Sequence, residues 1–154
     1  MNNLQTFTNT SQIPHQNQNG LADVITAYGE KRPRVLLAQD GENHCETLRE
    51  LLELYDLEVL EAESGEAAVD GAVIYRPDLI IMDKNLPGLG SFDAMRLIRA
   101  ISSLRDVPMI FLSDYPERTE RLQAFSSGAD DYLIKPLDLD RVDRVLEKFL
   151  FLKI

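Results

Sequence analysis

The chain has one cysteine and no tryptophan among its 154 residues. A single cysteine cannot form an intramolecular disulfide framework, which is typical of proteins from a reducing compartment. No pair of Cys or His residues has the spacing of a zinc site. We interpret Cys45 as a small hydrophobic residue buried on a helix, and we predict a cytoplasmic location.

Long apolar runs and positive charge are also scarce. No segment approaches the ~20 apolar residues that a membrane-spanning helix needs. The N-terminus lacks the basic and apolar regions of a secretory signal, and the first basic residue is Lys31. Sixteen Lys and Arg stand against 26 Asp and Glu, which gives a formal net charge of −10. Such a surface repels nucleic acid and anionic membranes, so neither is expected as a direct partner.

The first 32 residues differ in composition from the rest of the chain. This extension is rich in Asn, Gln and Thr, and we expect it to be largely disordered because it buries too little apolar surface. Its end has apolar residues at helical spacing, which indicates a short helix over residues 20–29. A helix that docks on the domain or a partner and a transient linker helix remain equal alternatives. Residues 33–154 are predicted to form the folded domain.

From Pro33 onward, five short runs of strand character alternate with segments of helical period. The runs lie at residues 35–38, 57–61, 79–82, 109–112 and 132–134. The first, third and fourth are apolar throughout, which is typical of strands buried on both faces of a parallel sheet. The second and fifth are shorter or mixed, which predicts edge strands.

The helical segments between the runs carry start signals. Ser64, Ser91 and Asp138 are predicted N-caps, and Pro116 stands where a first-turn proline begins a helix. Repeated strand–helix units predict an α/β fold: a doubly wound sheet of five parallel strands in the flavodoxin-like order 2-1-3-4-5, with five helices. In that order a ligand lies at the carboxyl ends of strands one, three and four.

Polar side chains stand at those strand ends. Strand one is followed by Gln39 and Asp40, strand three by Asp83, strand four by Ser113 and strand five by Lys135. Two neighbouring carboxylates repel each other unless a cation lies between them, and Mg²⁺ prefers oxygen ligands. Asp83 can then act as a nucleophile towards phosphorus, while Lys135 and Ser113 stabilise charge on the phosphoryl oxygens.

Four motifs, in this order and each on an expected strand end, carry a resemblance to a known family. They are residues 35–40 (VLLAQD), 77–88 (PDLIIMDKNLPG), 107–113 (VPMIFLS) and 128–136 (GADDYLIKP). Residues 34–152 resemble the receiver domain of bacterial response regulators, which is the signalling module of two-component systems and phosphorelays. The resemblance implies Mg²⁺-assisted phosphorylation of an aspartate and no separate enzymatic domain.

The resemblance also assigns roles to single residues. Asp83 matches the phosphoacceptor, and Lys135 matches the lysine that pairs with it. Asp40 matches the second acid of the metal pair, and the backbone carbonyl of Asn85 completes that metal site. A cis peptide is implied between Lys135 and Pro136.

A conformational switch is implied as well. Ser113 matches the hydroxyl that moves to contact the phosphoryl group, and Tyr132 matches the aromatic residue that then turns inward. A histidine kinase or a histidine phosphotransfer protein would donate the phosphoryl group. A downstream protein would bind the surface formed by helix four, strand five and helix five. Because the chain ends just after the fifth helix, a stand-alone receiver is expected.

Two residues depart from the family pattern. Gln39 stands where the family usually has an acid that holds the metal through water, so we expect weaker Mg²⁺ binding and slower phosphorylation. Asp114 follows the switch hydroxyl, where a small residue is usual. We favour an orientation of Asp114 towards solvent, and a metal-ligand role remains the alternative.

Other functions remain open beside the phosphorylation switch. A degenerate receiver that binds partners without phosphorylation is the main alternative, because Gln39 and Asp114 fit it. A phosphatase of the haloacid dehalogenase type would need a second Asp two residues after the nucleophile, and that position is Asn85. A flavodoxin would need a Ser/Thr/Gly-rich loop after strand one, and residues 41–44 (GENH) do not provide it.

Overall fold

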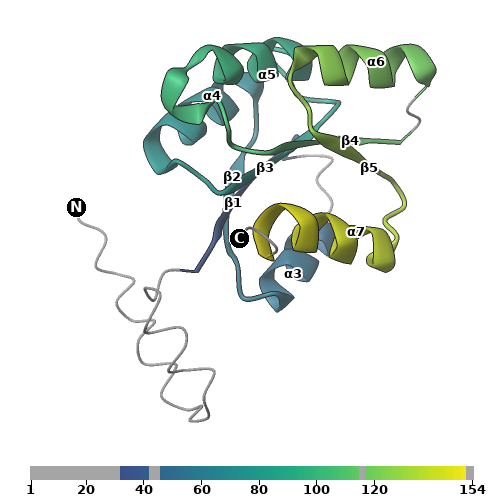
Figure 1. The fold of residues 1–154 in the computed structure, drawn as a ribbon. Coiled ribbons are helices and arrows are strands. Elements are labelled where there is room, and N and C mark those ends of the chain that lie inside the picture. The colour runs from purple at the N-terminus through teal and green to yellow at the C-terminus, as the bar shows by residue number, and fades with distance from the viewer. Residues whose placement is uncertain (1–31, 42–45, 115–116, 152–154) are drawn as a thin grey trace. The chain divides into compact units, whose positions relative to one another are not determined.

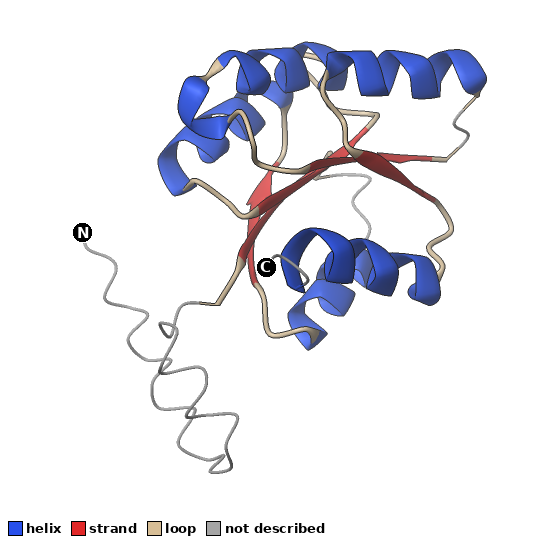
Figure 2. Cartoon of the chain, viewed as in Figure 1, coloured by secondary structure: helices blue, strands red, loops and turns tan. Residues whose placement is uncertain are grey.

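The computed structural model describes residues 32–41, 46–114 and 117–151. A five-stranded parallel sheet forms the centre of this domain (Figures 1 and 2). Its strands are β1 (Arg34–Ala38), β2 (Glu58–Ala62), β3 (Leu79–Asp83), β4 (Met109–Ser113) and β5 (Asp131–Ile134). They lie in the order β2-β1-β3-β4-β5. The predicted fold, the strand order and the two edge strands are therefore confirmed.

Helices cover both faces of the sheet. They are α3 (Glu46–Leu54), α4 (Gly65–Tyr75), α5 (Ser91–Ala100), α6 (Arg118–Ser127) and α7 (Leu139–Leu146), with a short 3₁₀-helix η3 (Ser102–Leu104) and a π-helix η4 (Glu147–Phe151). Helices α4, α5 and α6 lie on one face, and α3 and α7 lie on the other (Figure 1). Each face has its own hydrophobic cluster, so the sheet is buried on both sides.

The central strands supply both clusters by simple alternation. In β3, Leu79 and Ile81 face the α3/α7 side, while Ile80 and Met82 face the α4/α5/α6 side, and all four side chains are fully buried. Burial of each such side chain contributes about 1.5–3 kcal/mol. Because β1, β3 and β4 are fixed in this way, the residues that follow them are held at one edge of a rigid sheet.

Two of the three predicted caps are confirmed. The Ser64 hydroxyl accepts a hydrogen bond from the Ala67 amide at 3.0 Å, and the Asp138 carboxylate accepts one from the Asp140 amide at 3.0 Å. The prediction for Ser91 is wrong, since Gly90 is the N-cap residue of α5 and Ser91 begins the helix. Its hydroxyl instead points to the end of β3, as described below.

Several predictions fall outside the described residues. Cys45, Pro116 and the short helix over residues 20–29 are among them, so they stay predictions. The boundary between residues 32 and 33 also stays a prediction. Within the described ranges, no helix has the length and apolar character that crossing a membrane requires.

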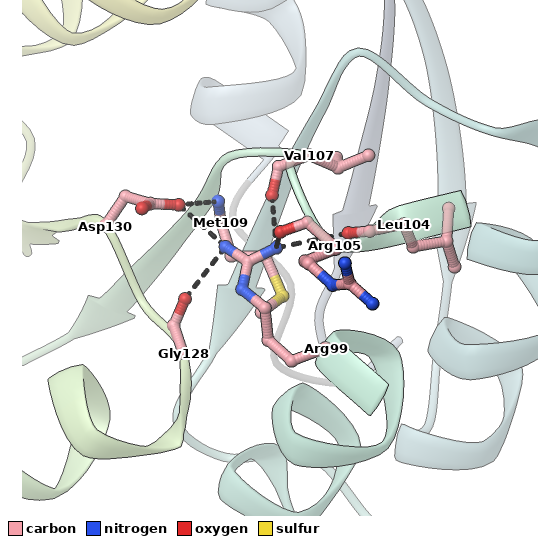
Figure 3. A network of polar contacts seen from close by, with 7 residues as sticks. All are labelled: Arg99, Leu104, Arg105, Val107, Met109, Gly128 and Asp130. Carbon is pink, nitrogen blue, oxygen red and sulfur yellow. Dashed lines mark hydrogen bonds and ion pairs between the residues drawn. The ribbon is translucent and has the colours of Figure 1, made fainter. Parts of the chain in front are cut away.

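Arg99 on α5 binds the loop that leads into β4 (Figure 3). Its Nη1 lies 2.6 Å from the carbonyl oxygen of Val107, 3.1 Å from that of Arg105 and 3.3 Å from that of Leu104. A guanidinium can serve several carbonyls at once because its donors are spread in a plane. Arg99 therefore satisfies backbone groups that the irregular segment after α5 leaves without a helix or strand partner.

The second nitrogen of Arg99 reaches the loop between α6 and β5. Its Nη2 lies 2.9 Å from the Gly128 carbonyl oxygen and 2.8 Å from Asp130 Oδ2. Asp130 Oδ2 also accepts a hydrogen bond from the Met109 amide at 2.9 Å. Gly128 has φ +123°, and a Cβ there would lie 2.7 Å from Arg99 Cγ. The start of the GADDYLIKP motif is thus structural and joins α5, β4 and β5 at the edge of the sheet where these strands begin.

Gly65, the first residue of α4, lies against the loop that follows β3. Its amide donates to the Pro87 carbonyl at 3.2 Å, and a Cβ there would lie 1.8 Å from the Leu89 carbonyl oxygen. The neighbouring Glu66 carboxylate accepts from the Leu89 amide at 3.1 Å. Hydrogen bonds from the backbone amides of Glu66 itself and of Leu89 lower the pKa of this carboxyl. The loop after Asp83 is therefore held against the start of α4.

We expect Gly65→Ala to lower the free energy of unfolding by about 2–3 kcal/mol, because the added methyl group collides with a backbone carbonyl. Gly90→Ala is the control, since a Cβ at Gly90 meets no atom within 4 Å, and we expect it to cost less than about 1 kcal/mol, the loss of an N-cap glycine. Urea denaturation measures both. Equal midpoints for the wild type and Gly65→Ala would contradict this packing.

We expect Arg99→Lys to cost about 2 kcal/mol of stability, because lysine keeps the charge but cannot donate to both loops at once. Arg105→Lys, at an exposed arginine in the same region, is the control and should be nearly neutral. Thermal unfolding followed by circular dichroism separates the two variants. If both lose the same stability, the bonds of Arg99 do not hold these loops.

Candidate functional site

The polar residues predicted at the strand ends meet at one edge of the sheet. The parallel register pairs Ala38 with Met82 and Asp83 with Leu112, so Gln39 follows beside Asp83. It also pairs Ser113 with Ile134, which places Lys135 just beyond Ser113. The register therefore brings the ends of β1, β3, β4 and β5 to the same edge of the sheet.

Asp83 is a buried carboxylate with partners on both oxygens. Its side chain is 4% exposed, and Oδ2 lies 2.7 Å from Lys135 Nζ. Oδ1 accepts a hydrogen bond from the Asn85 amide at 2.9 Å. A buried carboxylate needs such compensation, because leaving water is costly for an unpaired charge. The peptide between Lys135 and Pro136 is cis, as the resemblance implied.

The backbone at the end of β3 is held by the residue that begins α5. The Ser91 hydroxyl is buried and lies 2.5 Å from the Asp83 carbonyl oxygen and 2.9 Å from that of Lys84. Both carbonyls lie where the strand ladder ends, so they require a partner from elsewhere. The hydroxyl predicted to cap a helix instead fixes the backbone that carries Asp83.

The predicted metal ligands form a set of oxygen donors. Gln39 is 4% exposed, and its amide donates to the Ala62 carbonyl at 3.0 Å, while Asp40 is half-buried. Among the described residues, no group of three or more His, Cys, Asp and Glu forms a ready metal cage. Two carboxylates, one amide oxygen and the carbonyl of Asn85 fit Mg²⁺, which takes few protein ligands and keeps several waters.

Ser113 has a partner that sequence reasoning missed. Its hydroxyl is buried and donates to Glu120 Oε2, on α6, at 2.6 Å. Glu120 Oε1 lies 2.9 Å from Lys84 Nζ. The hydrogen bond to Glu120 raises the pKa of the Lys84 ammonium, against a smaller opposing effect of burial. No motif singles out Glu120, because it lies in the first turn of a helix where most polar residues are exposed.

Asp114 is exposed, as favoured from the sequence. Its side chain is 54% exposed, yet Oδ1 lies 3.8 Å from Lys135 Nζ. Lys135 is therefore shared between a buried acid at short distance and a solvated acid at longer distance. The second contact is weak, because exposed ion pairs contribute little in water.

Tyr132 lies on β5 and is half-buried. Its ring packs edge-on against Phe125 of α6, with centroids 6.1 Å apart. The guanidinium groups of Arg121 and Arg141 lie 5.9 Å and 5.8 Å from the ring centroid. Tyr132 therefore packs with side chains of α6 and α7.

Known proteins resemble this chain over the described domain. A family model, the response regulator receiver domain, matches residues 35–147. The cell cycle transcriptional regulator CtrA of Caulobacter vibrioides is 34% identical over 71% of this chain, and the match spans 46% of CtrA. The chain thus covers about half the length of that relative. Protein PilH of Pseudomonas aeruginosa is 32% identical, over 68% of this chain and 87% of PilH.

Solved structures show the same likeness. The receiver domain of sensor histidine kinase PA1611 from Pseudomonas aeruginosa, with magnesium in its active-site cleft, is 30% identical with a TM-score of 0.71. It covers 77% of this chain and 97% of that domain. The non-phosphorylated HemR receiver domain of Leptospira biflexa is 32% identical with a TM-score of 0.68, over 80% and 98% of the two chains.

Proposed function

The chain belongs to the response regulator receiver domain family, and from this premise we propose that it is a phosphorylation-dependent signalling switch with Asp83 as the phosphoacceptor. One observation carries the proposal: the buried Asp83 carboxylate lies 2.7 Å from Lys135 Nζ at the carboxyl edge of the sheet. Residues 33–154 would form the receiver domain. A cytoplasmic location accords with the reducing compartment that the single cysteine indicates.

In the proposed reaction, an Asp83 carboxylate oxygen attacks the phosphorus atom of the donor. A new oxygen–phosphorus bond forms as the bond from phosphorus to the donor breaks, and the donor atom keeps the electron pair. From a phosphohistidine, the leaving atom is an imidazole nitrogen. Lys135 holds the carboxylate in place before the reaction, and its ammonium stabilises the phosphoryl oxygens afterwards. Receiver domains act with histidine kinases or histidine phosphotransfer proteins, which are the proposed donors.

Mg²⁺ is the proposed cofactor. Asp40, Asp83 and the Asn85 carbonyl would hold it, and Gln39 would contribute only a neutral oxygen. When bound, Mg²⁺ offsets negative charge on the carboxylates and on the phosphoryl oxygens. The magnesium in the cleft of the PA1611 receiver domain supports the same cofactor here. We expect a weaker site than an acid at residue 39 would give.

The proposed output is a change in the surface made by α6, β5 and α7. Ser113 would turn to contact the phosphoryl group, and Tyr132 would move inward into the space near it. A downstream protein partner would distinguish the two states of this surface. Its differential affinity sets how far the equilibrium can shift. The alternative is a degenerate receiver that binds its partner without phosphorylation, which the neutral Gln39 favours.

Phosphorylation of Asp83 is tested by intact-mass analysis after incubation with Mg²⁺ and acetyl phosphate. We expect one phosphoryl adduct on the wild type and none on Asp83→Asn, because the amide is not a nucleophile. Asp70→Asn, at an exposed acid on α4, is the matched control and should keep the adduct. Absence of an adduct from the wild type, even at high Mg²⁺ concentration, would favour the phosphorylation-independent alternative.

The weak position in the metal site is tested at Gln39. We expect Gln39→Asp to bind Mg²⁺ more tightly by about 1–2 kcal/mol, because it restores a charged hydrogen-bond acceptor. Gln39→Asn shortens the side chain equally without adding charge, so it should not bind more tightly than the wild type. Isothermal titration calorimetry measures all three. Unchanged affinity in Gln39→Asp would show that the missing charge does not limit metal binding.

A further inference from the structure

Glu120 joins three elements at the phosphoacceptor edge of the sheet. Its side chain is 13% exposed and comes from α6. One carboxylate oxygen accepts from the Ser113 hydroxyl of β4 at 2.6 Å, and the other lies 2.9 Å from Lys84 Nζ, just after β3. Both carboxylate oxygens therefore have a partner near the proposed reaction centre. One partner is the residue that follows Asp83, and the other is the last residue of the neighbouring strand β4.

The two partners of Glu120 are held in place by the sheet. The Lys84 amide donates to the Leu112 carbonyl at 2.8 Å, which continues the ladder between β3 and β4 past Asp83. Ser113 ends β4, and its carbonyl accepts from the Lys135 amide at 3.0 Å. Since the backbones of Lys84 and Ser113 are fixed, the contacts of Glu120 are decided by side-chain rotation and by the position of α6.

The Ser113 hydroxyl has one proton to donate. While that proton is directed at Glu120, it cannot be directed at an oxygen of a phosphoryl group on Asp83. Turning Ser113 therefore exchanges one charge-assisted hydrogen bond for another, and such bonds are stronger than neutral ones. Lys84 contacts the other oxygen of Glu120, so turning Ser113 does not by itself remove the cation beside this carboxylate.

We propose that Glu120 is a positioning residue that holds the Ser113 hydroxyl in its unphosphorylated orientation and couples its release to α6. This inference rests on the proposed function, because it assumes that Asp83 accepts a phosphoryl group. When only a fraction of the protein is in the binding-competent state, the apparent dissociation constant of the ligand rises by the inverse of that fraction. The Glu120 contact lowers the apparent affinity for a phosphoryl group in this way, and it biases α6 towards the inactive surface.

The test measures the affinity for beryllofluoride, a phosphoryl mimic, at fixed Mg²⁺ concentration. We expect Glu120→Ala to bind it about tenfold more tightly than the wild type, and Glu120→Gln to show a smaller gain because its amide oxygen still accepts. Asp70→Ala is the control, since it removes an exposed acid from α4 that has no contact with Ser113, Lys84 or Glu120 among the described interactions. It should bind as the wild type does.

Repeating the Glu120→Ala substitution in a Ser113→Ala background separates the proposed role from a general effect of charge. The gain should vanish there, because Glu120 acts through the hydroxyl. A gain that persists in this background, or wild-type affinity in Glu120→Ala, would overturn the inference while leaving the proposed function intact. If neither the wild type nor any variant binds beryllofluoride, the proposed function fails, and this inference fails with it.

Discussion

The buried carboxylate of Asp83 and the ammonium of Lys135, 2.7 Å apart, impose the main constraint on this molecule. A carboxylate that is 4% exposed needs a cation and hydrogen-bond donors, or its burial destabilises the fold. Lys135 provides the cation from the end of β5, and the Asn85 amide provides a donor from the loop after β3. Strands β3, β4 and β5 must therefore end in register for the pair to form.

The amino and carboxyl edges of the sheet have different roles. At the edge where β4 and β5 begin, Arg99 and Asp130 satisfy loop carbonyls and amides, and no chemistry is proposed there. At the carboxyl edge, Asp83, Ser113 and Lys135 are held in place by the backbone ladder and by the Ser91 hydroxyl. A parallel sheet produces this division because all its strands end on the same side. Stability can then be concentrated at one edge while the other carries a site.

The balance of charges at the carboxyl edge sets the electrostatic cost of burying Asp83. Among the described residues of this site, Asp83, Asp114 and Glu120 form ion pairs with Lys84 and Lys135. Gln39 is neutral and therefore adds no negative charge near Asp83, which is paired with Lys135. A neutral side chain at residue 39 lowers the repulsion around Asp83 when no metal is bound, and it is also the reason why a weaker Mg²⁺ site is proposed.

The sequence by itself determined the strands, their order and the residues at their ends. Apolar runs identified β1, β3 and β4 as buried strands, and mixed runs identified the edge strands. The pattern of apolar residues along a strand depends on whether one or both of its faces are buried. Asp83 and Lys135 could be placed at one edge of the sheet, because each follows a strand and parallel strands end on the same side. Ser64 and Asp138 were predictable as caps, because capping depends on residues two or three positions away.

Only the tertiary structure decided where the side chains of different elements meet. Ser91 has the same local signal as Ser64, yet its hydroxyl binds the end of β3. Glu120 of α6 reaches Ser113 at the end of β4 and Lys84 after β3, and Arg99 of α5 reaches Asp130 before β5. Local periodicity carries no information about such contacts, because they depend on how a helix rotates and slides on the sheet until its packing and hydrogen bonds are satisfied together.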